Sequence, residues 1–195
     1  MSQNQQILSD LSNLATEIKS NFESFVAESP KITTTMHKST QKLKDLNSIA
    51  GSLPKEVAIS RMLEINTDED NETKAVFGKL NQYLDMCEDL AAKWLVKYDE
   101  LLKVSLLNKE DIDKIKALTG FLQVCGTILS LFVATLEAAT NQISSKDSPQ
   151  TPTIINVINL NRRFIKDCAA IVISFNDTAK ELERLLSAQV SNKIN

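Results

Sequence analysis

The feature that most constrains the fold of this chain is a stripe of apolar and small residues that recur alternately three and four positions apart. The stripe runs through Ile112, Ile115, Thr119, Leu122, Gly126, Leu129, Val133, Leu136, Thr140 and Ile143. Because an α-helix has about 3.6 residues per turn, this alternation places all of these side chains on one helical face. The spacing predicts a long helix over residues 110–144 that packs lengthwise against other helices.

Two further stripes of similar spacing flank this segment. The first, in residues 73–107, consists of Val76, Leu80, Tyr83, Cys87, Leu90, Trp94, Tyr98 and Leu101. The second, in residues 153–190, consists of Ile154, Ile158, Asn161, Ile165, Cys168, Val172, Phe175, Ala179, Leu182 and Leu186. The chain has only 4 glycines and 4 prolines, so few segments favour turns or long loops. We therefore expect three long helices towards the C-terminus.

The first 65 residues predict two or three shorter helices. Helical spacing of apolar residues continues as far as Phe25, and Pro30 is expected to end that helix because proline lacks an amide hydrogen. A second, weaker helix is expected to close at Gly51 and Pro54, and a short third element follows. We interpret the acidic run 67–72 as a loop that caps the next helix.

Short connections between long helices favour antiparallel neighbours in space. No composition shift or internal repeat divides the chain, so residues 1–195 are predicted to form a single domain. The expected fold is an all-α, elongated, antiparallel helical bundle, with the long helices 73–107, 110–144 and 153–190 packed in sequence order and completed by shorter helices from residues 1–65.

Charge and cysteine content indicate the compartment and exclude one class of partner. The net charge of −3, without a basic block, argues against nucleic-acid binding. The N-terminus lacks the basic and apolar regions of a signal peptide, so we expect a cytoplasmic protein. Cys87, Cys125 and Cys168 have no C-x-x-C spacing and are expected to be reduced. We interpret them as small core residues, the alternative being three thiols that converge on a soft metal.

The usual catalytic and cofactor motifs are missing from the sequence. His37 is the only histidine, which leaves catalytic triads and histidine-based metal sites without a required residue, and we expect it on the surface. No glycine-rich phosphate-binding loop occurs. The acidic run departs from a calcium-binding loop at two diagnostic positions, Thr73 and Lys79. We therefore predict a protein that is not an enzyme and binds no cofactor or metal.

One segment raises the question of a membrane. The 20 residues from Ala117 to Leu136 carry no charge, which is about the length that a bilayer core requires. They contain Leu129 and Val133 and most of a ladder of small residues that suits close helix packing, namely Gly126, Ser130, Ala134 and Ala138. Three interpretations stay open: a helix buried at the centre of the bundle, a buried helix that inserts into membranes, and a permanent membrane span.

The layout resembles that of soluble helical pore-forming toxins, which keep an apolar helical segment within a long bundle until they meet a membrane. This resemblance concerns the arrangement of segments and not any residue motif. It implies a membrane-active bundle in which the helix 117–136 inserts, and release from the cell by a route that needs no signal peptide.

The long helical faces and the missing catalytic residues favour another function. We expect a non-enzymatic bundle that acts through protein–protein interaction, either with another protein or with a second copy of itself. Arg162, Arg163 and Lys166 form a small basic group on the last helix and are a candidate interaction face, the alternative being an ordinary solvated surface. The membrane-active bundle is the second hypothesis.

Overall fold

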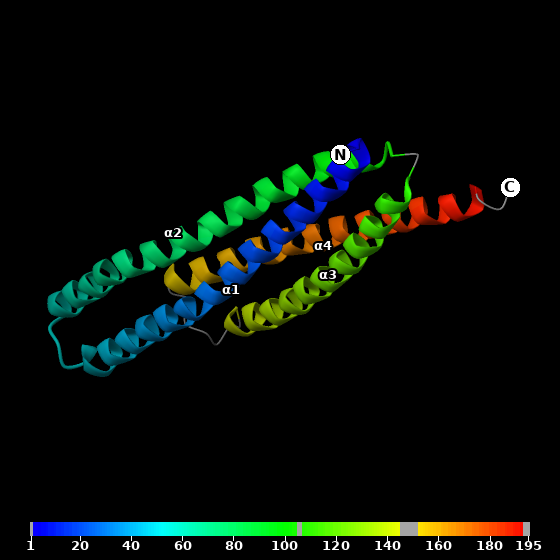
Figure 1. The fold of residues 1–195 in the computed structure, drawn as a ribbon. Coiled ribbons are helices and arrows are strands. Elements are labelled where there is room, and N and C mark those ends of the chain that lie inside the picture. The colour runs from blue at the N-terminus through cyan, green and yellow to red at the C-terminus, as the bar shows by residue number, and fades with distance from the viewer. Residues whose placement is uncertain (1, 105–106, 145–151, 193–195) are drawn as a thin grey trace.

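The computed structural model describes residues 2–104, 107–144 and 152–192. For some helical residues within these ranges it describes the backbone alone. The described part of the chain is all-α, as predicted. It consists of α1 (Gln3–Ala50), α2 (Lys55–Leu101), α3 (Lys109–Ile143) and α4 (Pro152–Asn192). Figure 1 shows the elongated bundle that these helices form.

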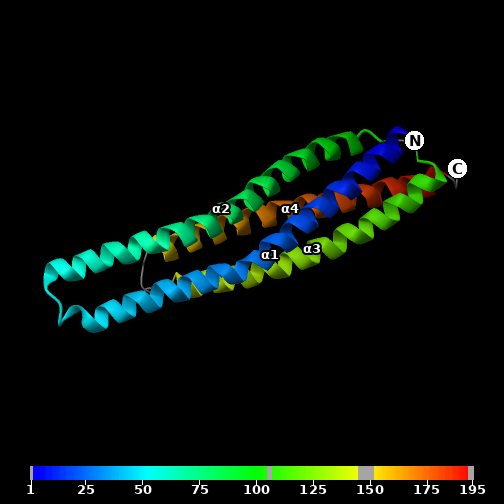
Figure 2. The ribbon, with the colours of Figure 1, turned by 60° about the vertical axis from the view of Figure 1, so that its left-hand side comes forward.

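The four helices are arranged as two antiparallel hairpins. α1 packs along α2 and α3 packs along α4, and the hairpins meet where α1 lies against α3 and α2 against α4. In Figures 1 and 2 the turn between α1 and α2 lies beyond the ends of α3 and α4, so the first hairpin is the longer one. Chain direction makes α1 parallel to α3 and α2 parallel to α4 (Figure 2).

This arrangement corrects the expectation that the long helices pack in sequence order. Across the described residues, α2 and α3 do not pack against each other, although they are consecutive. α2 ends at Leu101 at the same end of the bundle where α3 begins, but α3 lies against α1 and so stands diagonally across from α2 (Figure 1). A short link therefore did not make its two helices neighbours here.

The prediction that Pro30 ends a first, short helix was wrong. α1 continues through Pro30 as one helix of 48 residues. Proline cannot donate to the carbonyl four residues earlier, which is that of Val26. The Ser29 hydroxyl donates to this carbonyl instead, with 2.7 Å between the two oxygens. Because Pro30 itself is exposed, its ring lies on the solvent side and the buried face of α1 remains continuous.

The acidic run 67–72 is also not the loop that we predicted. Its backbone lies within α2, which has 47 residues and absorbs the short third element as well. From Lys55 to Leu101 the sequence contains no proline and one glycine, so nothing in it breaks a helix. The turn at Gly51 and Pro54 is where we expected it. The two or three N-terminal helices are therefore one long helix and the first half of another.

Aromatic residues fill the core where the two hairpins meet. The Phe25 and Phe164 rings stack at 3.7 Å between centroids, and Phe22 meets Phe132 edge-on at 4.8 Å. Further along, the buried Trp94 donates its indole hydrogen to Thr178 Oγ1 at 3.1 Å. These contacts join α1 to α3 and α4, and also α2 to α4, so they fix how one hairpin sits on the other.

A capping box begins α3 close to the predicted start of that helix. Asn108 Oδ1 accepts from the Asp111 amide at 2.9 Å, and Asp111 Oδ2 accepts from the Asn108 amide at 3.0 Å. Asn4 of α1 also donates to Asp111 Oδ2, at 3.4 Å. The same group of side chains therefore starts α3 and holds it against the beginning of α1.

Candidate interaction surface

The inner face of α3 is buried by α1 and α4. This face includes the predicted stripe residues Ile115, Leu122 and Leu129, which are at most 3% exposed. Val133 and Leu136 are half-buried and pack against the same core. The stripe that predicted the helix is thus the face that joins it to the rest of the bundle.

The opposite face of α3 carries a second stripe with the same alternating spacing, which we call the outer seam. Its members are Ala117, Phe121, Val124, Ile128, Leu131, Thr135 and Ala138. Phe121 is half-buried and the other members are exposed. Val124 is 59%, Ile128 is 45% and Leu131 is 66% exposed, so the three large aliphatic side chains at its centre face solvent.

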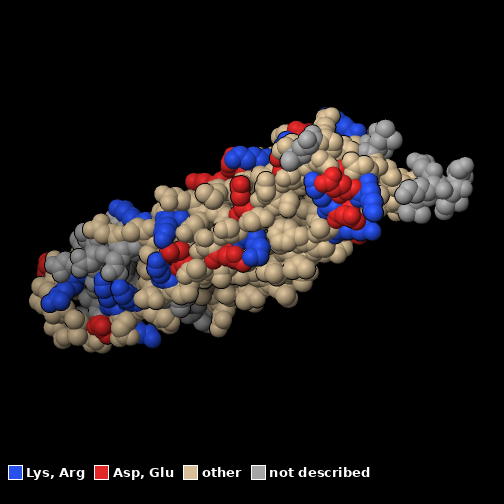
Figure 3. All heavy atoms as spheres, in the orientation of Figure 1, with Lys and Arg blue, Asp and Glu red and all other residues tan. Residues whose placement is uncertain are grey.

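The position of α3 in the bundle explains this exposure. Its packing neighbours among the described helices are α1 and α4, and both lie on its inner side. In Figure 3 the surface over the middle of α3 has no blue or red spheres. Of the four described helices, α3 alone is long and apolar enough to cross a membrane, yet only 33% of its most apolar window is buried. The interpretation as a helix buried at the bundle centre was therefore wrong.

The ladder of small residues does not form one packing face. Gly126 is buried against α4, where a Cβ atom would lie 3.8 Å from Asn176 Oδ1. Ser130, Ala134 and Ala138 are exposed. Each step of four residues advances about 40° around a helix, so the ladder turns from the α4 contact out to solvent. Of this set, only Ala138 belongs to the outer seam.

A shallow groove of about 440 Å³ runs beside the outer seam, between α3 and α4. It is lined by Gln123, Gly126, Thr127, Ser130, Leu131 and Asn176. Small side chains and the absent side chain of Gly126 create this groove. The surface next to Leu131 is therefore recessed, and it leaves room for side chains of a partner helix.

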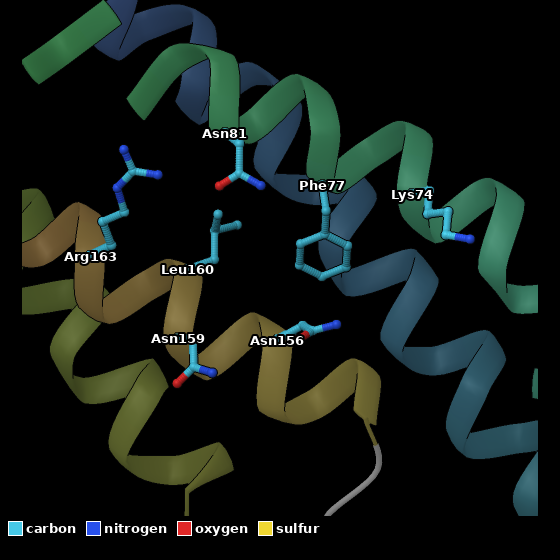
Figure 4. Close-up of a pocket in the computed structure, with 7 residues that line it drawn as sticks. All are labelled: Lys74, Phe77, Asn81, Asn156, Asn159, Leu160 and Arg163. Atoms are coloured by element: carbon cyan, nitrogen blue, oxygen red, sulfur yellow. The ribbon is translucent and has the colours of Figure 1, made fainter. Parts of the chain in front are cut away.

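A second groove, of about 430 Å³, lies between α2 and α4 and is drawn in Figure 4. Its lining combines three amide side chains, two apolar ones and two cationic ones: Lys74, Phe77, Asn81, Asn156, Asn159, Leu160 and Arg163. Asn81 and Leu160 extend towards each other across it. No carboxylate, histidine or thiol is among these residues, so the groove offers hydrogen bonding, apolar contact and positive charge.

The three residues of the predicted basic group on α4 differ in their contacts. The Arg163 guanidinium reaches α2, where Nη2 lies 2.7 Å from Asp85 Oδ1 and 3.0 Å from Glu88 Oε1. Its charge therefore joins two helices of the same molecule. Arg162 and Lys166 are exposed. The interaction face that we expected from three basic residues thus retains two of them.

The three cysteines are buried and lie in different surroundings. Asn21 Nδ2 donates to Cys87 Sγ at 2.9 Å, whereas Cys125 lines a small apolar space with Phe22 and Phe175. Burial raises the pKa of all three thiols, most strongly that of Cys168. Among the described residues, no group of three histidine, cysteine or acidic side chains is placed to hold a metal ion, and the exposed His37 lies on α1.

The outer seam is the feature that reasoning from the sequence missed. The spacing of the outer seam is present in the sequence. The segment that contains it is apolar on nearly all sides of the helix, and we interpreted this apolar character as a sign of burial. No protein-family profile, curated protein sequence or solved structure matched it.

Proposed function

We propose that this protein is a non-enzymatic interaction protein whose outer seam on α3 binds another protein. The observation that carries the proposal is the exposure of Val124, Ile128 and Leu131 in register on one uncharged face. Single exposed apolar residues are common on soluble proteins, but a contiguous line of them usually marks an interface.

The spacing of the outer seam indicates the kind of surface that would cover it. Its residues alternate three and four positions apart, which is the repeat by which helices pack lengthwise in coiled coils. Burying such a stripe removes apolar surface from water, at about 25 cal/mol for each Å². A helical partner is therefore the best fit to an apolar stripe that runs along a long helix.

The surroundings of the remaining polar groups agree with a role in binding rather than catalysis. Both larger grooves are open and have linings of mostly amide, hydroxyl and aliphatic side chains. Burial raises the pKa of the thiols, which makes them poor nucleophiles at neutral pH.

The proposal is tested with a photo-reactive amino acid at one of two exposed apolar positions. Leu131 lies on the outer seam, whereas Ile173, which is 62% exposed, lies on α4 and serves as the matched control. In cells that make the protein, we expect cross-linked products from position 131 but not from position 173. Excess wild-type protein should compete for them, and a Val124→Gln/Leu131→Gln variant should not. Equal products from both positions would contradict the proposal.

Membrane activity is the second candidate function, and the apolar character of α3 favours it. If α3 inserts into bilayers, the protein should float with liposomes and release an enclosed dye. The Thr140 and Asn161 side chains hydrogen-bond between α3 and α4 at 3.1 Å, so a disulfide between Thr140→Cys and Asn161→Cys should hold α3 in the bundle. Dye release that persists in the locked, folded protein would rule out insertion of α3.

A further inference from the structure

We propose that the outer seam of α3 packs against the outer seam of a second copy of this chain, with the two helices antiparallel. This inference rests on the proposed function, because it names the partner of the same surface. It is argued from the register of the seam and from the charges that flank it.

The register allows the seam to meet itself. Val124 and Leu131 are one heptad apart, and Ile128 falls between them at the alternate position of the repeat. When two such helices run antiparallel about a two-fold axis near residue 126, Val124 of each copy lies opposite Ile128 of the other. Phe121 then lies opposite Leu131 by the same symmetry. The largest side chains of the seam are thus at the middle of the contact.

The charges at the ends of the seam select the antiparallel arrangement. Lys116 and Glu137 bracket the uncharged stretch, and because they are three heptads apart they lie on the same flank of α3. Both are exposed, and neither forms an ion pair with another described residue. An antiparallel pair places Lys116 of each copy beside Glu137 of the other. A parallel pair would bring opposite flanks together, so Lys116 and Glu137 would not meet across the contact.

The same flank also permits close approach of the two helices. The groove lined by Thr127 and Ser130 lies along it, and Gly120 and Ala134 add little bulk. A two-fold axis between antiparallel helices brings equivalent flanks together, so Gly120 of each copy would lie near Ala134 of the other and Thr127 near its own counterpart. An interfacial membrane helix would instead carry basic side chains on its polar face and bulky aromatic anchors, which are not the residues of this flank.

The first test measures the association of the purified full-length chain by sedimentation velocity over a wide range of concentration. We expect a reversible dimer that the Val124→Gln/Leu131→Gln variant weakens at least about tenfold. The Ile173→Gln variant on α4 is the control and should associate as the wild type does. A chain that stays monomeric at every concentration would overturn the inference. Photo-cross-links from Leu131 to a different protein would then still support the proposed function.

Charge reversal tests the direction of the pair. Lys116→Glu and Glu137→Lys should each weaken the dimer, because each places like charges side by side. The double variant Lys116→Glu/Glu137→Lys should regain wild-type association, since it restores opposite charges in an antiparallel pair. A parallel dimer keeps positions 116 and 137 apart from each other in all four proteins, so neither the losses nor the rescue would appear.

Disulfide trapping gives an independent readout of the register. Ala117→Cys and Thr135→Cys lie opposite each other in the antiparallel arrangement. Under mild oxidation, a mixture of the two variants should form cross-linked dimers, whereas each variant alone should not. The wild-type chain, in which all three native cysteines are buried, is the control. Cross-linking of each variant with itself would show a parallel pair and overturn the proposal.

Discussion

The two faces of α3 have the same residue spacing but opposite surroundings. The inner face is covered by α1 and α4, and Leu129 on it is 3% exposed. The centre of the outer seam faces solvent, and Leu131, only two residues away, is 66% exposed. The comparison teaches that helical periodicity identifies a face able to pack, whereas the number of neighbours around the helix decides whether that face is covered.

The largest expected effect comes from shortening one leucine on each face. Leu129→Ala should lower the free energy of unfolding by about 3 kcal/mol, because it leaves a cavity in the core. Leu131→Ala should change it by less than about 0.5 kcal/mol, because solvent already surrounds that side chain. Urea unfolding, at a dilution that keeps the chain monomeric, measures both. Similar losses for the two variants would show that the outer seam is covered within the molecule.

Thiol reactivity gives a second comparison of a buried and an exposed position on α3. Burial raises the pKa of Cys125, so at neutral pH its reactive thiolate is scarcer than that of an exposed cysteine. A cysteine introduced as Val124→Cys should react with a thiol reagent at least about thirtyfold faster than Cys125. As pH rises, the rate at position 124 should level off near pH 8.5, whereas the rate at Cys125 should continue to rise. Equal rates in the folded protein would be the contrary result.

Substitutions at two threonines compare the stability contributed by a buried hydrogen bond with that of an exposed one. Thr178 accepts from the Trp94 indole inside the core, whereas the exposed Thr135 donates to the carbonyl of Leu131 on its own helix. Thr178→Val should cost about 1 to 2 kcal/mol, because the buried indole hydrogen loses its acceptor. Thr135→Val should cost less than about 0.5 kcal/mol. Thermal unfolding gives the magnitudes, and the fluorescence of the only tryptophan reports the change at Trp94.

The smallest effect is expected at the charged edge between α2 and α4. Arg163→Gln should destabilise the protein by about 0.5 kcal/mol, because its ion pairs with Asp85 and Glu88 are partly exposed and screened by water. Arg162→Gln, at the exposed neighbouring position, is the matched control and should have no measurable effect. The difference should shrink as salt is added. A loss as large as that of Leu129→Ala would mean that charge, and not apolar packing, holds α2 to α4.

Much of the fold follows from the sequence because apolar spacing is a local property. It predicted α3 over 110–144, and the helix runs from Lys109 to Ile143. The error at Pro30 arose because a neighbouring serine supplies the missing hydrogen bond, a compensation that a rule about proline alone does not include. The diagonal placement of α3 depends on how two finished hairpins fit together, which no single segment encodes.

The candidate site was only partly predictable for the same reason. The uncharged stretch 117–136 was recognised as unusual, but its exposure depends on where α3 lies in the bundle. Likewise, the basic group on α4 was visible in the sequence, whereas the carboxylates that engage Arg163 lie on α2, far away along the chain. The same repeat, taken two positions along from the inner stripe, gives the outer seam.

The pairing of α1 with α3 has a consequence for the order in which the chain folds. Within each hairpin, contacts can grow outward from the turn, so only short stretches of chain are ordered at each step. The contacts that join the hairpins are remote: Gln5 donates to Glu110 Oε2, and Asn4 to Asp111, across more than a hundred residues. We expect the hairpins to form early and to dock slowly, since distant contacts cost more chain entropy. In kinetic terms the molecule is assembled from two halves, and their covalent connection within one chain keeps each half close enough to find the other.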